Sequence, residues 1–452
     1  MVQNYRPINI TPVISRVMEK VVKDQTSDYL LNGGLISASQ HGFLKRRSCA
    51  TCLIDFFDEI TRNRDQKKLV IILYFDIQKA FDRVPHNLLI CKLQSIGITN
   101  PLLGWFKSFL TNRYQITKVG TVTSTPRPIT SGVVQGSVLG PLLFIIYINS
   151  ICRCFITGNP YLYADDLKVV YKTDKNDVAH CIENMQDELN KLGKWCSKWC
   201  LEFNTEKCGW MCVGDPKLEV QLVLSNHKLP KLNTVTDLGI QYSHNINFSE
   251  HISAKLSKSR RLLGFILRNF HQNESRLSLY KICVRPTLEY CSFLFSDLRT
   301  SDKIRVESVQ RYLTRQMIKG NSKIDYKTRC HMLGLEPLWK RRLRTNLILF
   351  YKLLHDMTYT SINIAYRTYT RDYYLRNKIS QVKIENYKTK ARANFYLIRY
   401  GQIWNKLPAA VRMADNLPVF CKLLNTALRD ISFLVDEATY SDTLEVIGPL
   451  NI

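Results

Sequence analysis

The segment Tyr161-Leu-Tyr-Ala-Asp-Asp-Leu-Lys-Val-Val170 sets two adjacent carboxylates between two short apolar runs. This pattern predicts a strand, a tight acidic turn and a returning strand, because apolar β-rich runs bounded by turn residues are typical of hairpins. An Asp-Asp pair alone is weak evidence for a metal site, since aspartates favour turns by bonding nearby backbone groups. A third carboxylate at the same place would favour a metal site.

Asp76 is that third carboxylate. It follows the run Leu69-Val-Ile-Ile-Leu-Tyr-Phe75, which is too short for a core helix and predicts a buried central strand. A carboxylate that ends a buried strand, beside an acidic turn from a neighbouring strand, offers the oxygen ligands that Mg²⁺ prefers. Two such ions, about 3.5–4 Å apart, stabilise the attacking and leaving oxygens of a phosphoryl displacement. The residues alone therefore predict a polymerase or a metal-dependent nuclease.

The composition indicates a nucleic-acid partner. The 452 residues are enough for more than one domain. Lysine and arginine number 64 against 38 acidic residues, which gives a net charge of +26. Such an excess favours a polyanionic partner, nucleic acid first, over charge that serves solubility alone.

The cysteines and the apolar runs indicate an intracellular protein of the nucleus or cytoplasm. The 14 cysteines follow no disulfide framework, and the N-terminus has no basic-then-apolar leader. Cys49 and Cys52 have zinc-like spacing, but no second pair follows at a finger-like distance. The longest apolar run is well short of the ~20 residues that cross a bilayer, so we expect no membrane span.

Helical patterns and a glycine-rich segment surround these strands. Apolar spacing predicts one helix that Gly97 stops and a second from Pro101 to Leu110. The segment Ser131-Gly-Val-Val-Gln-Gly-Ser-Val-Leu-Gly-Pro141 then leads into an apolar run. A loop before a helix N-terminus could hold phosphate, although the Lys-Ser/Thr ending of a Walker loop is absent.

Two later segments are basic. A helix from His251 to Phe270 would place cations outside that could track a phosphate backbone, although each alone suits a solvated helix face equally well. These cations are Lys255, Lys258, Arg260 and Arg261. Between Tyr359 and Arg376, interleaved tyrosines and arginines suit single-stranded nucleic acid or an ordinary surface, and both interpretations stay open.

Seven segments in order resemble the reverse transcriptases of non-LTR (LINE-type) retrotransposons, particularly the jockey-like clades. The resemblance runs from Tyr5 to about Ile252 and is weaker beyond. It rests on Tyr5-Arg-Pro-Ile8, Gln40-His-Gly-Phe43, Phe75-Asp-Ile-Gln-Lys-Ala-Phe-Asp82, the glycine-rich segment, Tyr163-Ala-Asp-Asp166, Leu201-Glu-Phe-Asn-Thr-Glu-Lys-Cys208 and Leu238-Gly239.

The resemblance implies an α+β fold, the right-hand polymerase with fingers, palm and thumb. Its palm sheet would be antiparallel, and a mainly helical C-terminal region would follow. We expect incomplete fingers and the palm over residues 1–245, a helical thumb over 246–325, and a helical, basic C-terminal region over 326–452.

The resemblance also implies roles for particular residues. Asp76 and Asp165 would bind two Mg²⁺ ions, with Mn²⁺ as an alternative, and Asp166 would assist beside them. Lys207 would neutralise or protonate the departing pyrophosphate. Leu238-Gly239 would form the primer-binding hairpin, where glycine lets the backbone approach the primer end.

The same resemblance assigns the nucleotide contacts. Arg6 would bind the nucleotide phosphates, because an arginine fork suits triphosphate oxygens. Phe81 would close over the sugar of the nucleotide; a core phenylalanine is its alternative. Gln135 and Gly136 would support the template and the nucleotide.

The implied reaction is DNA synthesis from deoxynucleoside triphosphates on an RNA template and a DNA primer or target. Two departures bear on it. Val134 stands where the family commonly has proline, and the chain begins at the Tyr-Arg-Pro-Ile motif, so we expect an upstream fingers segment and an endonuclease to be missing. A non-catalytic nucleic-acid-binding remnant and a group II intron-like maturase are the alternatives to an active enzyme.

Overall fold

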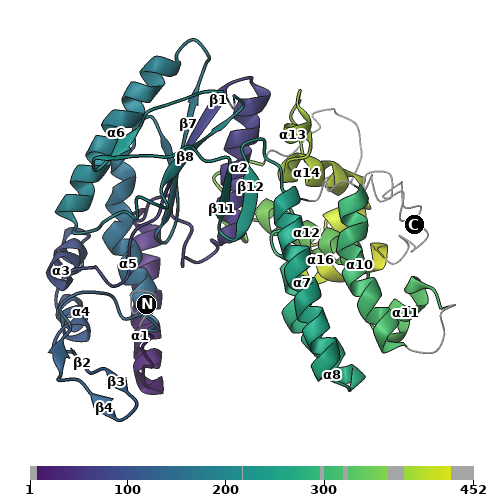
Figure 1. Ribbon diagram of the computed structural model, residues 1–452, viewed down its shortest axis with the longest axis horizontal. Coiled ribbons are helices and arrows are strands. Elements are labelled where there is room, and N and C mark those ends of the chain that lie inside the picture. Colours follow the sequence, from purple (N-terminus) through teal and green to yellow (C-terminus); the bar gives the residue numbers. More distant parts are fainter. Residues whose placement is uncertain (1–7, 216, 296–299, 319–323, 365–380, 429–452) are drawn as a thin grey trace. The chain divides into compact units, whose positions relative to one another are not determined.

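The protein is described by a computed structural model that covers residues 8–215, 217–295, 300–318, 324–364 and 381–428 (Figure 1). The chain forms two compact units. Unit 1 comprises Met1–Phe56 and Lys67–Asn233, and unit 2 comprises Phe57–Gln66 and Thr234–Ile452. The boundary passes through one helix, α2 (Cys49–Asp65), whose first half belongs to unit 1 and whose second half belongs to unit 2.

Unit 1 is built on a four-stranded antiparallel sheet with strand order β6-β7-β1-β8. The central strand β1 (Leu69–Phe75) is buried along its whole length, as its β-branched, apolar sequence predicts. Its neighbours are β7 (Asp166–Thr173) and β8 (Gly209–Val213), and β6 (Asn159–Tyr163) lies outside β7. The hairpin and the central strand expected from the sequence are confirmed.

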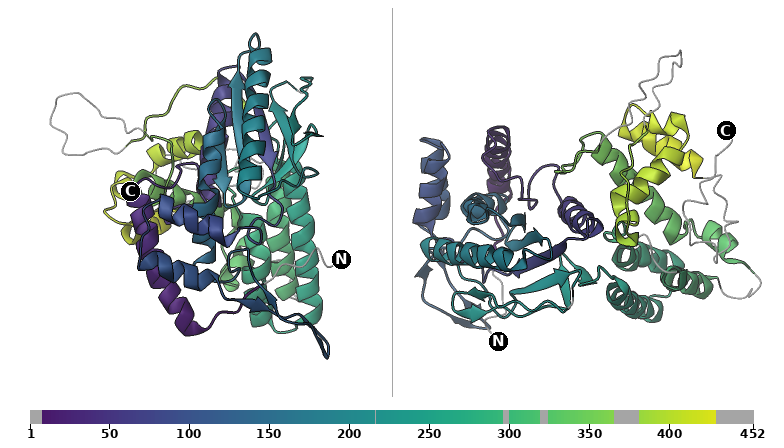
Figure 2. Two further views of the ribbon diagram at one scale, coloured as in Figure 1. Left: turned by 90° about the vertical axis from the view of Figure 1, so that its left-hand side faces the viewer. Right: turned by 90° about the horizontal axis from the view of Figure 1, so that it is seen from above.

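Each face of this sheet has its own covering. The side chains of Ile71, Leu73 and Phe75 lie in one core with helices α5 (Gly140–Ile148) and α6 (Val178–Lys198), which occupy the same side of the sheet in Figures 1 and 2. Tyr74, Lys168 and Tyr161 pair in register across three strands. On this other face of the sheet, the first half of α2 provides the covering. The Lys168 ammonium lies 4.0 Å from the ring centre of Phe56 in α2, and Phe56 meets Tyr161 edge to face.

The remaining elements of unit 1 surround the sheet. Gly97, with a φ of +87°, follows the end of α3, as the sequence predicts. These elements are α1 (Val13–Asn32), α3 (His86–Ser95), α4 (Leu102–Leu110), β2 (Tyr114–Gln115), β3 (Lys118–Val119), β4 (Val122–Thr123), β5 (Arg127–Pro128), a 3₁₀ helix (Asn149–Cys154), β9 (Val223–Leu224) and β10 (His227–Lys228).

Unit 2 is mainly helical. It opens with a hairpin of β11 (Thr234–Asp237) and β12 (Ile240–Ser243), and helix α7 (Ser249–Asn269) then packs against α10 (Thr300–Met317). Its other elements are α8 (Asn273–Leu279), a π-helical turn (Tyr280–Val284), α9 (Arg285–Glu289), α11 (Tyr326–Met332), α12 (Leu338–Leu354), α13 (Lys390–Ala393), α14 (Tyr396–Lys406), α15 (Ala409–Arg412) and α16 (Leu417–Ala427).

The predicted α+β fold class, with an antiparallel sheet followed by a mainly helical region, is confirmed. The boundary between the units at Asn233 and Thr234 is a division by compactness, so the functional domains at 1–245, 246–325 and 326–452 stay predictions. Within the described ranges, no helix combines the length and apolarity that a membrane crossing requires.

Candidate active site

Asp76 directly follows β1, and main-chain hydrogen bonds hold the segment that it begins. The amide of Asn204 donates a hydrogen bond of 2.8 Å to the Asp76 carbonyl, and the amide of Gln78 donates one of 2.8 Å to the Glu202 carbonyl. Ile77 forms an antiparallel bridge with Phe203 between these two bonds. The Leu201–Cys208 motif is thereby held beside the Asp76 carboxylate.

Lys207 is the cation that this pairing brings to Asp76. Its Nζ lies 3.6 Å from Oδ2 of Asp76, and the two side chains are 66% and 35% exposed. An ion pair this open contributes little stability, about 0–1 kcal/mol. Burial raises the pKa of the neighbouring Cys208 thiol to about 11, so it is a neutral thiol at neutral pH. Lys207 is therefore an exposed cation next to this carboxylate.

Asp165 and Asp166 lie at the turn between β6 and β7. Tyr163 pairs with Asp166, which leaves Ala164 and Asp165 as the two turn residues. Phe75 pairs with Leu167 in the antiparallel ladder of β1 and β7, so the next residue on each strand is Asp76 and Asp166. The register thus sets all three aspartates at one end of the sheet.

These carboxylates suit a hard divalent cation by their chemistry. In the part of the chain that the structure describes, no group of three histidine, cysteine or acidic side chains is gathered closely enough to form a finished metal site. The donor set at the sheet end is nevertheless all oxygen, and both Asp76 and Asp165 are partly exposed. The roles of Asp76, Asp165 and Asp166 as metal ligands stay a prediction.

The glycine-rich segment lies against the residues that follow Asp76. The amide of Val133 donates to the Phe81 carbonyl and the amide of Gly132 to the Val84 carbonyl, each at 2.8 Å. The Ser131 hydroxyl donates to the Asp82 carbonyl at 3.1 Å. The glycine-rich segment and the motif that begins at Phe75, about 50 positions apart, therefore form one local structure.

Gln135 and Gly136 occupy constrained positions in this segment. The side-chain nitrogen Nε2 of Gln135 donates a hydrogen bond of 2.5 Å to Oδ1 of Asp82, which fixes the direction of the Gln135 side chain. Gly136 has a φ of +94°, and a Cβ there would lie 2.4 Å from the Asn9 carbonyl oxygen. Only glycine allows this approach. Contacts of either residue with a template or nucleotide stay a prediction.

Phe81 lies in an aromatic cluster. Its ring stacks on Phe144 with a centroid distance of 4.3 Å, and it meets Phe43 edge to face at 6.4 Å. Phe81 is partly buried, while Phe43 is 47% exposed. The surroundings fit both the sugar contact and the core role that the sequence left open.

The N-terminus of α5 is already occupied by a carboxylate. Oε2 of Glu19, a residue that is only 1% exposed, accepts hydrogen bonds from the amides of Val138 at 2.8 Å and Leu139 at 3.1 Å. The Ser137 hydroxyl accepts from the amide of Gly140 at 2.9 Å. Because Glu19 neutralises this helix end from within, our interpretation of the loop as a phosphate site at a free helix N-terminus is wrong.

The predicted primer-binding hairpin is confirmed as a hairpin in unit 2. Leu238 and Gly239 form the turn between β11 and β12 with φ values of +46° and +78°, and a two-residue turn with both φ positive favours glycine. The Tyr290 hydroxyl donates to the Leu238 carbonyl at 2.9 Å. Primer binding by these residues stays a prediction.

The predicted basic helix is confirmed as α7, with apolar residues such as Leu256 and Leu263 buried. Of its cations, Lys258, Arg260 and Arg261 are exposed and Lys255 is half-buried. Arg6 lies outside the described residues, as does most of the tyrosine- and arginine-rich stretch, so their predicted roles are untouched by the structure.

Neither Glu19 nor Gln40 had a predicted role in the site. Glu19 contacts amides 119 and 120 positions away, and no spacing pattern in the sequence signals such a contact. Gln40 bonds the acidic turn at Ala164. The motif Gln40-His-Gly-Phe43 that contains it was recognisable, but the partner of its glutamine was not.

Comparison with known proteins gives a consistent family. The family described as "Reverse transcriptase (RNA-dependent DNA polymerase)" matches residues 2–267. The probable RNA-directed DNA polymerase from transposon X-element of Drosophila melanogaster is 26% identical over 325 residues, which is 69% of this chain and 35% of that protein. The polymerase from mobile element jockey of the same fly is 26% identical over 304 residues, 64% of this chain and 33% of that protein.

The chain thus spans about a third of the length of these curated relatives. Among solved structures, telomerase from Candida tropicalis, in complex with a TWJ fragment of telomeric RNA, gives a TM-score of 0.41 at 13% identity. That similarity covers 92% of this chain and 57% of the telomerase chain, and it is too low to add to the family match.

Proposed function

Because the chain belongs to the reverse transcriptase (RNA-dependent DNA polymerase) family, we propose that it catalyses RNA-templated DNA synthesis as part of a non-LTR retrotransposon protein. One observation carries this proposal most directly. The strand register brings Asp76 and the turn with Asp165 and Asp166 to the same end of the sheet, with Lys207 on Asp76. Carboxylates beside an exposed lysine suit phosphoryl transfer.

In the proposed reaction, a primer 3′-hydroxyl attacks the α-phosphate of a deoxynucleoside triphosphate. Asp76 and Asp165 would hold two Mg²⁺ ions, or Mn²⁺, with Asp166 beside them; when bound, the ions lower the proton affinity of the hydroxyl and neutralise phosphate charge. Lys207 would swing from Asp76 to the departing pyrophosphate, which its high exposure permits.

The remaining predicted residues would bind the substrates. Arg6 would contact the triphosphate, and Phe81, Gln135 and Gly136 would shape the nucleotide and template site. Leu238-Gly239 would hold the DNA primer, and the cations of α7 would contact the nucleic-acid backbone. The proposed function assigns three kinds of partner inside the cell: an RNA template, a DNA primer or target, and nucleotides.

Primer extension on an RNA template tests the proposal. Purified chain, Mg²⁺ and deoxynucleotides are compared with Asp165→Asn and with Asp187→Asn, a matched change at an exposed aspartate of α6. Asp165→Asn should lower the rate by at least about 10²-fold, the usual effect of removing a group that stabilises transition-state charge. Asp187→Asn should leave it unchanged.

Other outcomes would select the alternatives. Nucleic-acid binding without extension, in wild type and variants alike, would favour a non-catalytic remnant. Degradation of nucleic acid in the absence of nucleotides would favour a nuclease. Dependence of activity on an intron RNA would favour a maturase.

A further inference from the structure

The segment Ser39–Gly42 runs beside the strand that leads into the acidic turn. Gln40 forms a parallel bridge with Leu162. The amide of Leu162 donates to the Ser39 carbonyl at 2.9 Å, and the amide of His41 donates to the Leu162 carbonyl at 2.8 Å. The segment therefore extends the sheet beyond β6 at the end where the aspartates lie.

The Gln40 side chain binds both main-chain polar groups of Ala164. Its Oε1 accepts hydrogen bonds from the amides of Ala164 at 2.9 Å and Gly42 at 2.8 Å. Its Nε2 donates to the Ala164 carbonyl at 3.4 Å. Gln40 is 2% exposed and Ala164 is 4% exposed, so water cannot replace these bonds at low cost.

Ala164 has a backbone conformation that needs such support. Its φ of +59° lies in the left-handed region, which costs a residue with a Cβ about 1–2 kcal/mol. Ala164 directly precedes Asp165, so its dihedral angles set the direction in which the two carboxylates leave the turn. The carboxamide of Gln40 fixes those angles from a segment 124 positions away.

Two neighbours hold Gln40 in place. A Cβ on Gly42 would lie 2.5 Å from the Ala164 amide nitrogen, so the close approach of the two segments requires glycine. The Arg47 guanidinium donates to the carbonyls of Ser37, Ala38 and Gln40 and ties the preceding loop together. The Gly42 approach and the Arg47 bonds thus hold the main chain of Gln40 beside the turn.

We infer that Gln40 is a positioning residue of the active site: its carboxamide holds Ala164 in the left-handed conformation that aims Asp165 and Asp166. This inference rests on the proposed polymerase function. A merely structural role would affect only stability, whereas a positioning role affects the direction of the Asp165 and Asp166 carboxylates. The loss of Gln40 should therefore act on turnover and on divalent-cation affinity more than on nucleotide affinity.

The test compares Gln40→Met with Gln186→Met in the full chain. Methionine has a similar length and no hydrogen-bonding amide. Gln186 is the control, because its carboxamide also bonds the amide and carbonyl of one residue, Val223, both at 2.9 Å, outside the acidic turn. Turnover, nucleotide KM, Mn²⁺ affinity by electron paramagnetic resonance, and hydrogen exchange of the Ala164 amide are measured.

Gln40→Met should lower kcat and Mn²⁺ affinity by about 10–100-fold, with nucleotide KM changed much less, as misplacement of a reacting group or loss of a ligand's support does. The Ala164 amide should exchange faster. Gln186→Met should change none of these. If Gln40→Met matches Gln186→Met in Mn²⁺ affinity and kcat, the inference is overturned.

Two further arms keep the test decisive. If Gln40→Met does not fold, Gln40→Asn keeps an uncharged carboxamide and shortens its reach by one methylene, and it should show a smaller loss in the same direction. If the wild-type chain extends no primer, the proposed function fails, while Mn²⁺ affinity and exchange at Ala164 still decide whether Gln40 positions the carboxylates.

Discussion

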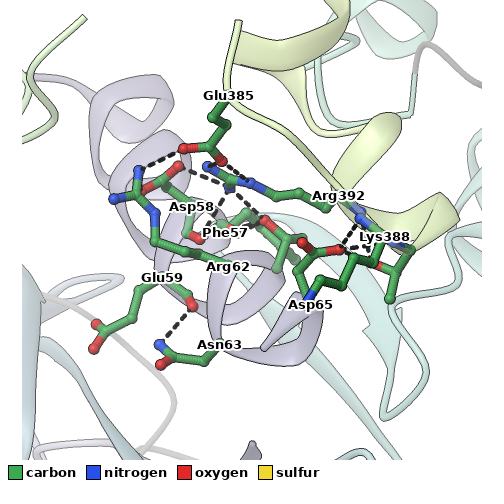
Figure 3. A network of polar contacts seen from close by, with 11 residues as sticks. Phe57, Asp58, Glu59, Arg62, Asn63, Asp65, Glu385, Lys388 and Arg392 are labelled. Atoms are coloured by element: carbon green, nitrogen blue, oxygen red, sulfur yellow. Dashed lines mark hydrogen bonds and ion pairs between the residues drawn. The ribbon is translucent and has the colours of Figure 1, made fainter. Parts of the chain in front are cut away.

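The acidic turn of unit 1 and the second half of α2 in unit 2 are both fixed by distant segments, but by opposite kinds of interaction. At the turn, the uncharged carboxamide of Gln40 binds main-chain groups of Ala164, the residue before Asp165 and Asp166. On α2, a buried guanidinium binds carboxylates directly (Figure 3). A neutral support adds no charge beside the proposed metal ligands, and a charged one suits a structural joint.

The joint on α2 is centred on Arg392, whose side chain is 2% exposed. Its guanidinium lies 2.8 Å from Oδ1 of Asp58, donates to the Thr61 hydroxyl at 2.9 Å, and also pairs with Glu385. One turn further along α2, Oδ1 of Asp65 accepts bonds from the amides of Lys388 and Thr389 and from the Thr389 hydroxyl. The segment from Glu385 to Arg392 is thereby bound along the helix (Figure 3).

The largest expected effect is on this joint. Arg392→Ala should lower the free energy of unfolding of unit 2 by about 3–5 kcal/mol, because it breaks a buried ion pair and leaves Asp58 with only the half-exposed Arg62, whose Nη2 lies 3.0 Å from Oδ2 of Asp58. Hydrogen exchange of peptides from each unit measures the loss. Lys45→Ala breaks the exposed pair with Asp28 and should cost less than about 1 kcal/mol.

The same hydrogen-exchange measurement tests whether the Gln40 contact at the turn and the Arg392 contact on α2 act independently. Arg392→Ala should leave the exchange of the Ala164 amide at its wild-type rate, since the joint belongs to unit 2 and the turn to unit 1. Equal losses in Arg392→Ala and Lys45→Ala would contradict the structural importance of the buried guanidinium.

A smaller effect is expected from adding a side chain at Gly42, where the Gln40 segment lies closest to the turn. Gly42→Ala puts a Cβ 2.5 Å from a backbone nitrogen, so the segment must move, and overpacking of this kind costs about 1–3 kcal/mol. Polymerase activity should fall together with exchange protection at Ala164. Gly193→Ala in α6, where the nearest side-chain atom lies 3.7 Å away, should be neutral or slightly stabilising.

The smallest effect is expected in the pH dependence of stability, and each unit has one histidine whose pKa is lowered by a large amount. Burial, then the charges of Arg47 and Lys168, lower the pKa of His41 to about 3, although Oδ2 of Asp55 lies 3.9 Å from its ring. Burial, then Lys255, lower the pKa of His251 to about 4.

In both cases the folded pKa is below the unfolded value, so the unfolded state binds the proton first as pH falls. The stability is fully present above about pH 6.5 and is lost toward the folded pKa, by up to about 1.4 kcal/mol per pH unit for each histidine. Urea unfolding between pH 7.5 and 5 with exchange readout per unit measures this. His41→Gln should flatten the dependence in unit 1 only, and His251→Gln in unit 2 only; a swapped or shared change would refute the assignment.

Local patterns in the sequence predicted the catalytic framework. The strand at Leu69–Phe75, the turn at Asp165 and Asp166, and the helix α7 followed from short-range periodicity and turn chemistry, because burial on one face imposes a period on neighbouring residues. Contacts of the glycine-rich segment with Phe81 and Asp82 were not predicted, and its helix N-terminus was misinterpreted, because Glu19 comes from another helix.

By itself, then, the sequence predicted the strand, the acidic turn and the helix that carry the candidate residues, since these elements depend on residue type and near neighbours. Only the tertiary structure decided what holds those elements in position. Gln40 on Ala164, Glu19 on Val138 and Arg392 on Asp58 join positions separated by 124, 119 and 334 residues. A buried polar group selects its partner by geometry after packing, and that selection leaves no periodic trace along the chain.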